Sequence, residues 1–114
     1  MKYMLQVRLN GADTLIGRLP GEEQQKVTAE FEAIRKSSGV LDGNQLQAAS
    51  GAATVRVHGG QTEVTEGPPV EAGAEVNGYY ISDAPDLDAA IAFAARIPVA
   101  RMGGTVEVRA LMER

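Results

Sequence analysis

Few side chains in this sequence are suited to acid–base chemistry, and the first to consider is His58, the only histidine. Imidazole titrates closest to neutral pH of all the side chains. His58 is followed by Gly59-Gly60, a pattern typical of a solvated residue beside a tight turn. One histidine without any cysteine cannot build the usual zinc site, which needs three or four N, S or O ligands. We therefore expect no metal and no cofactor.

Two carboxylates remain as candidate general bases, Asp42 and Glu66. Asp42 begins the run Asp-Gly-Asn, which common turn chemistry also explains. An enzyme alternative is a lyase or isomerase on a small organic substrate. In it, one of these carboxylates acts as the base while Arg8 or Tyr79 stabilises developing negative charge.

The composition is that of one globular domain spanning 1–114. Apolar residues make up 44% of the chain and charged residues 23%, which is ordinary for a folded protein. The net charge of −4 and the scattered arginines argue against nucleic acid as a partner. No apolar run is long enough for a secretory signal or for a membrane span of about 20 residues. A cytoplasmic protein without membrane contact is the expectation.

Hydrophobic periodicity predicts the elements of the first half. Strict alternation predicts a half-buried strand over Lys2–Leu9, and turn residues predict a loop over Asn10–Gly17. Apolar residues at helical spacing, with acidic residues at the start and Gly39 after the end, predict a helix over Glu22–Ser37. A weaker strand follows over Val40–Gln47.

A hairpin is predicted over Thr54–Glu66. Gly59-Gly60 supplies the two positive-φ positions that a tight two-residue turn requires. Opposed residues then have numbers that sum to 119, which places Val55 opposite Val64. Cross-strand pairs of this kind stabilise a sheet by roughly 0.2–1 kcal/mol each.

The second half repeats the strand–helix–strand order. We expect a strand over Val76–Ser82, a helix over Pro85–Ile97 and a closing strand over Thr105–Leu111. With the hairpin removed, two strand–helix–strand units remain. The expected fold is therefore α+β and ferredoxin-like with an inserted β-hairpin.

Right-handed crossovers place both helices on one face of such a sheet. The opposite face then carries a mixture of apolar and charged side chains, namely Met4, Gln6, Arg8, Glu107 and Arg109. We expect a second copy of the chain to cover this face and to enclose a ligand-binding cavity. Tyr79 and Tyr80 are adjacent on one strand, so one of them faces the helices and the other reaches the cavity.

The residues that carry a family resemblance are Lys2–Leu5, the run Glu66-Gly67-Pro68-Pro69 and the stretch from Gly78 to Glu113. Together they resemble the YCII-related family, in particular its DGPF branch. The branch signature Asp-Gly-Pro-Phe differs from this chain at two of its four positions. Glu66 stands in place of the Asp, and Pro69 stands in place of the Phe. The resemblance implies a dimeric α+β barrel.

Proteins of this family are suspected enzymes because of a histidine in the first helix paired with an acidic residue near its end. Spacing back from Gly39 places these positions at Thr28 and Ser37, and neither is a base at neutral pH. The resemblance therefore implies binding without strong catalysis. Some relatives are linked to dehydrochlorination of small aromatic compounds, and others accompany alternative sigma factors of the extracytoplasmic type.

The preferred interpretation is a homodimer that binds a small molecule or a partner protein. The expected ligand-binding residues are Arg8, Thr28, Glu66 and Tyr79. A third possibility is an interaction module that acts with a transcription-related protein.

Overall fold

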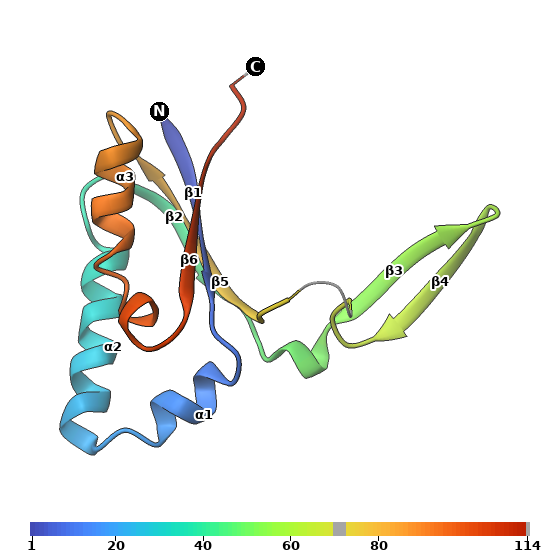
Figure 1. Ribbon diagram of the computed structural model, residues 1–114, viewed down its shortest axis with the longest axis horizontal. Helices are drawn as coiled ribbons and strands as arrows, with labels where there is room; N and C mark the ends of the chain where they lie inside the picture. Colours follow the sequence, from blue (N-terminus) through green and yellow to red (C-terminus); the bar gives the residue numbers. More distant parts are fainter. Residues whose placement is uncertain (70–72, 114) are drawn as a thin grey trace.

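A four-stranded antiparallel sheet forms the centre of the computed structural model, which describes residues 1–69 and 73–113. Its order is β2-β5-β1-β6 (Figure 1). The bounds of these strands are β1 Lys2–Arg8, β2 Val40–Gln45, β5 Val76–Asp83 and β6 Thr105–Ala110. Every neighbouring pair in the sheet is antiparallel. The chain is thus α+β, and its strand order is compatible with a ferredoxin-like fold.

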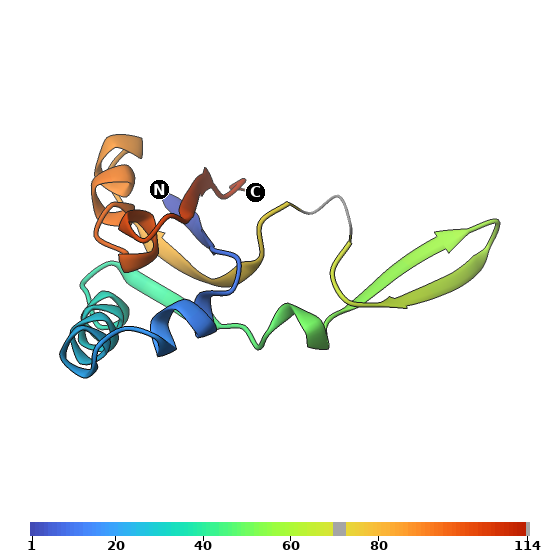
Figure 2. The same ribbon diagram turned by 60° about the horizontal axis from the view of Figure 1, so that its bottom comes forward.

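The helices lie on one side of this sheet, as Figures 1 and 2 both show. In the described part of the chain, the α-helices are α1 Ala12–Gly17, α2 Gly21–Arg35 and α3 Leu87–Ala94. The core forms between them and the side chains of β1 that point the same way. Leu5 is fully buried there, and Ile34 of α2 and Ala90 of α3 pack in the same cluster.

The predicted loop over Asn10–Gly17 is wrong for residues 12–17, which form α1. This helix was not predicted because α1 has only six residues, with Gly11 before it and Gly17 as its last residue. So few turns cannot show a periodic apolar pattern. Its stability comes from tertiary contact, since Ala12 is buried in the core cluster.

The later helix is shorter than the predicted Pro85–Ile97. It begins after Asp86, whose Oδ1 accepts a hydrogen bond from the Ala89 amide at 2.8 Å. It ends at Ala94. The amide of the C-cap residue Ala95 still donates to the Ile91 carbonyl, but the next two amides donate only three residues back, as Ile97 N does to Ala94 O. A 3₁₀ turn follows over Pro98–Arg101.

Strands β3 (Ala53–His58) and β4 (Gln61–Glu66) form a second, two-stranded sheet of their own. The predicted register is confirmed, with Val55 opposite Val64. The turn has φ of 58° at Gly59 and 79° at Gly60, the left-handed backbone that glycine adopts without a steric cost. In both ribbon views this hairpin projects from the side of the sheet opposite the helices (Figures 1 and 2).

The helix-free face of the central sheet has the predicted composition. Its members follow from the register with β1 and from alternation along each strand: Met4, Gln6, Arg8, Asp42, Asn44, Tyr79, Ile81, Glu107 and Arg109. Met4 and Ile81 oppose each other on the two central strands. The polar groups around them bond within the face: Arg8 to Gln6 at 2.6 Å, and Arg109 to Glu107 at 2.7 Å.

Candidate functional site

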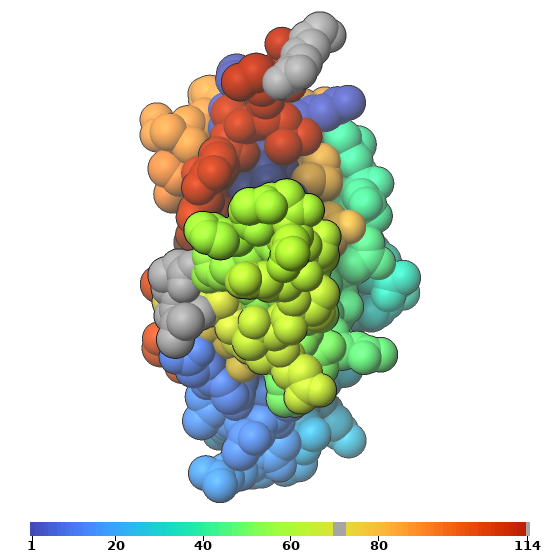
Figure 3. Space-filling view, turned by 90° about the vertical axis from the view of Figure 1, so that its right-hand side faces the viewer, coloured from blue at the N-terminus to red at the C-terminus, as the bar shows by residue number. Residues whose placement is uncertain are grey.

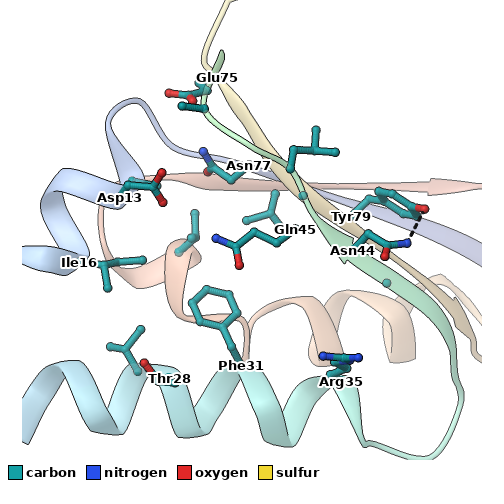
Figure 4. Close-up of a pocket in the computed structure, with 18 of the residues that line it drawn as sticks. Asp13, Ile16, Thr28, Phe31, Arg35, Asn44, Gln45, Glu75, Asn77 and Tyr79 are labelled. Carbon is teal, nitrogen blue, oxygen red and sulfur yellow. Dashed lines mark hydrogen bonds between the residues drawn. The ribbon is translucent and has the colours of Figure 1, made fainter. Parts of the chain in front are cut away.

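A pocket of about 570 Å³ lies between the helices α1 and α2 and the strands β2 and β5 (Figure 4). Small-molecule sites in proteins commonly have about 300–1,000 Å³. This pocket is on the helix-covered side of the sheet, whereas the expected cavity was on the open side. Apolar side chains from several elements form part of its wall, namely Val7, Ile16, Val27, Phe31 and Val99.

Helix α2 presents one face to this pocket. Thr28, Phe31 and Arg35 are spaced by three and four residues, so they share a face of the helix, and all three line the pocket (Figure 4). The Phe31 ring is partly buried and packs against the core cluster. Arg35 is the cation among the described lining residues.

The sheet contributes polar side chains opposite α2. Gln45 of β2 and Asn77 of β5 both point toward the pocket (Figure 4). The Asn77 amide nitrogen donates to the Leu9 carbonyl at 3.0 Å, and Asn77 Oδ1 is buried without a hydrogen-bond partner. An unsatisfied buried acceptor costs roughly 1–3 kcal/mol, so this wall of the pocket is polar at the expense of stability.

Glu75 connects the loops at the end of the pocket that α1 borders. Its carboxylate accepts from the Ala49 amide at 3.0 Å and from the Gly11 amide at 3.4 Å. Its own backbone amide donates to Asn10 Oδ1 at 2.8 Å. These bonds tie the start of α1 to the 3₁₀ turn at Ala49–Gly51, which fixes the shape of the pocket at this end.

Tyr80 lies on the pocket side of β5, since it is paired with Leu5 and Gly43 across the sheet. Its ring lies directly against Gly43, where an added Cβ would be 2.6 Å from Tyr80 Cδ1. Burial raises the pKa of the Tyr80 phenol, while the Arg35 guanidinium lowers it in part and Glu32 adds to the rise. A neutral phenol both donates and accepts hydrogen bonds.

Of the expected ligand-binding residues, Thr28 and Tyr79 are among the pocket-lining residues, and Arg8 and Glu66 are not. The Tyr79 phenol lies on the open face by alternation and accepts a hydrogen bond from Asn44 Nδ2 at 2.9 Å (Figure 4). Arg8 is on the open face as well, and Glu66 ends β4 of the hairpin. The expected ligand-binding residues therefore lie in three places: at the pocket, on the open face of the sheet and on the hairpin.

The candidate bases are also separated from the pocket. Asp42 is exposed on β2 and accepts a bond from the following amide, Gly43 N, at 2.9 Å. His58 is exposed near the hairpin turn. Among residues 1–69 and 73–113, no group of three or more His, Cys, Asp and Glu side chains is arranged to hold a metal ion.

Thr28 and Ser37, the positions expected to correspond to the family's suspected dyad, both donate hydrogen bonds to backbone carbonyls of α2. Thr28 Oγ1 donates to the Gln24 carbonyl at 2.9 Å, and Ser37 Oγ donates to the Ala33 carbonyl at 2.7 Å. Such i→i−4 bonds are the usual way for a hydroxyl to be satisfied on a helix. The proton of each hydroxyl is therefore donated to the helix backbone.

Several pocket residues were absent from the sequence-based set, notably Asp13, Gln45, Glu75 and Asn77. The sequence did contain a signal for the walls formed by β2 and β5. A glycine within a strand often marks a place where backbone or ligand comes close. Gly78 follows Asn77, and Gly43 lies near Gln45. Asp13 had no such signal, because α1 itself was not expected.

The profile of the YCII-related domain matches residues 1–114. The chain therefore belongs to the YCII-related family. No curated protein matches the sequence. Within the described ranges 1–69 and 73–113, no helix is both long and apolar enough to cross a membrane.

Proposed function

We propose that this YCII-related protein binds a small organic molecule in the pocket between α1, α2 and the sheet. The observation that supports this proposal is the pocket itself, about 570 Å³ in size with the Phe31 ring on one wall and Gln45 and Asn77 facing it. Pockets that combine an apolar wall with a few convergent polar groups are the usual form of a ligand site.

The charges around the pocket favour a ligand with two different ends. Asp13 and Glu75 lie toward one end of the pocket and Arg35 toward the other (Figure 4). A ligand with hydrogen-bond donors at one end and an acceptor or anionic group at the other fits this distribution. Its middle part would be apolar, so that it packs on Phe31.

The first experiment compares two phenylalanine substitutions on adjacent residues of α2. A panel of small organic acids, amides and amines is screened by NMR for compounds that shift the signals of Phe31, Gln45 and Asn77. Thr28→Phe places a ring in the pocket, and such compounds should then bind at least tenfold more weakly. Ala29→Phe, on an exposed position that does not line the pocket, should leave their affinity unchanged. Equal affinity in both variants would rule out this pocket as the site.

The open face of the sheet supports the second part of the proposal, a homodimer of the α+β barrel type built from ferredoxin-like units with inserted hairpins. Met4 and Ile81 at the centre, surrounded by bonded polar pairs, give this face the apolar core and polar rim of a protein interface. Light scattering should give the mass of two chains, and a monomer at micromolar concentration would contradict it.

The carboxylates around the pocket keep the enzyme alternative as a second candidate. Asp13, Glu32 and Glu75 line the pocket, and Glu75 is already held by two backbone amides. A lyase or isomerase would therefore take its base from Asp13 or Glu32, in place of Asp42 or Glu66. If turnover of a panel compound is found, Asp13→Asn or Glu32→Gln should abolish it. Loss of turnover in Asp42→Asn or Glu66→Gln alone would favour the carboxylate changed in that variant as the base.

A further inference from the structure

The hairpin formed by β3 and β4 has one apolar face that stays exposed among the described residues 1–69 and 73–113. Val55, Val57 and Val64 are 59%, 69% and 65% exposed. The register and alternation place all three on the same face of the hairpin, where Thr62 is opposite Val57 and the pair Ala53 and Glu66 lies at the base. The opposite face carries Arg56, His58 and Glu63. The hairpin is thus amphipathic, like a strand pair that packs on another surface.

A two-stranded hairpin alone in water is marginally stable at best. Within its own chain, this one is tied mainly at its base, where Thr54 Oγ1 donates to Gly67 O at 2.7 Å and Gly67 N donates to Ala52 O at 2.7 Å. Seen from the hairpin side, it stands in front of the rest of the molecule (Figure 3). A projecting apolar ribbon of this kind needs a covering surface.

The whole chain also exposes more surface than a compact monomer. Its accessible surface is 7846 Å², whereas a compact protein of 12.0 kDa exposes about 6,000 Å². The excess, on the order of 1,800 Å² by the same scaling, is larger than the roughly 800 Å² that each partner buries in a standard interface. The radius of gyration of 16.0 Å likewise exceeds the ~13 Å expected for a compact chain of this length.

The direction of the hairpin identifies what covers it. It projects from the same side of the sheet as the open face (Figures 1 and 2). Its strands have six residues each, which span about 20 Å, whereas two sheets stacked face to face are only about 10 Å apart. A second copy seated on the open face would therefore lie alongside the hairpin.

We infer that each hairpin is an exchanged arm, whose Val55, Val57 and Val64 pack on the second copy of this chain. This inference rests on the proposed homodimer and adds to it a contact outside the central sheets. In a twofold symmetric dimer both arms make the same contact, so the valine faces of both chains are buried together.

The test compares substitutions on the two faces of the hairpin. In the first variant Val55, Val57 and Val64 are all changed to threonine, which keeps the β-branched shape and the strand propensity. In the matched control the other face carries His58→Thr, Gln61→Thr and Thr65→Ser. Sedimentation equilibrium gives the dimer dissociation constant of each.

The valine-face variant should raise the dissociation constant at least tenfold, and the control should leave it within about threefold of the wild type. A wild-type dimer whose dissociation constant is the same in both variants would overturn the exchanged arm and leave the proposed homodimer intact. A wild-type chain that is monomeric throughout would overturn both.

Hydrogen exchange on the wild type provides a second readout that does not depend on how the variants fold. Amide protection in residues 53–66 should fall when the protein is diluted below its dissociation constant, because the arm then loses its cover. Protection that is equally low at all concentrations would overturn the inference, since the arm would then be uncovered in the dimer or covered by a different partner.

Discussion

At the scale of single residues, two glycines inside strands determine how closely the sheet packs around the pocket. Gly43 lies under the Tyr80 ring. At Gly78 an added Cβ would be 2.7 Å from the Asn44 carbonyl oxygen and 3.3 Å from Gln45 Cα. Both obstacles at Gly78 are backbone atoms of β2, which cannot move aside as a flexible side chain would.

Gly78→Ala should therefore destabilise the protein by about 1–3 kcal/mol, the usual cost of overpacking, because β2 must shift away from β5. Urea unfolding followed by circular dichroism measures the change. Gly51→Ala is the control, since a Cβ there meets nothing within 4 Å and Gly51 does not have a positive φ. An equal loss in both variants would contradict the argument.

The phenol of Tyr80 predicts a dependence of stability on alkaline pH. Burial raises its pKa above the ordinary value of 10.0, so the folded chain holds this proton more tightly than the unfolded chain. The stabilisation is complete below pH 10.0 and is lost as the pH rises through the folded-state pKa. Tyr80→Phe should remove this part of the alkaline loss, and Tyr79→Phe should retain it. Urea unfolding below and above the folded-state pKa of Tyr80 measures the free energy of unfolding of each variant. If this free energy falls equally with rising pH in the two variants, the prediction is refuted.

At the scale of secondary-structure elements, local chemistry decided which predictions succeeded. The hairpin register was predictable because Gly59-Gly60 fixes the turn, and the turn fixes every pair beyond it. The short helix α1 was missed because its formation depends on the burial of Ala12 against distant residues. Only two of the expected ligand residues, Thr28 and Tyr79, are among those that line the pocket, because the pocket walls come from segments whose spatial order is set by the sheet.

The start of α3 gives a prediction at this scale. Asp86 is its N-cap, with Oδ1 bonded to the Ala89 amide. Asp86→Ala should lower the free energy of unfolding by about 0.5–2 kcal/mol, and Asp86→Asn should lower it much less, since asparagine caps nearly as well. Chemical denaturation distinguishes the two variants. A loss of the same size in the asparagine variant would show that the charge, and not the cap bond, matters.

At the scale of the whole molecule, the sequence predicted the α+β class and the composition of the open sheet face, because alternation along β1 fixes both faces. It did not predict where the hairpin projects. That direction depends on the segments that join β2 and β5 to the hairpin, and their paths follow from packing and from the Glu75 bonds to the loops.

The separation of the hairpin from the central sheet gives the last prediction. Neither β3 nor β4 pairs with any strand of the four-stranded sheet, and the chain enters and leaves the hairpin where Gly67 N bonds to Ala52 O. Residues 53–66 can therefore be replaced by a two-glycine link without breaking a strand pair of the central sheet. The shortened chain should unfold cooperatively, and it should retain the binding of any compound found for the pocket.

Its association should differ, because the arm is gone. Sedimentation should show a dissociation constant at least tenfold above that of the full chain, since the valine face no longer covers a partner. Loss of cooperative unfolding would instead mean that the hairpin is part of the folding unit of its own chain. The two results are read from separate measurements, so the role of the hairpin in folding is distinguished from its role in assembly.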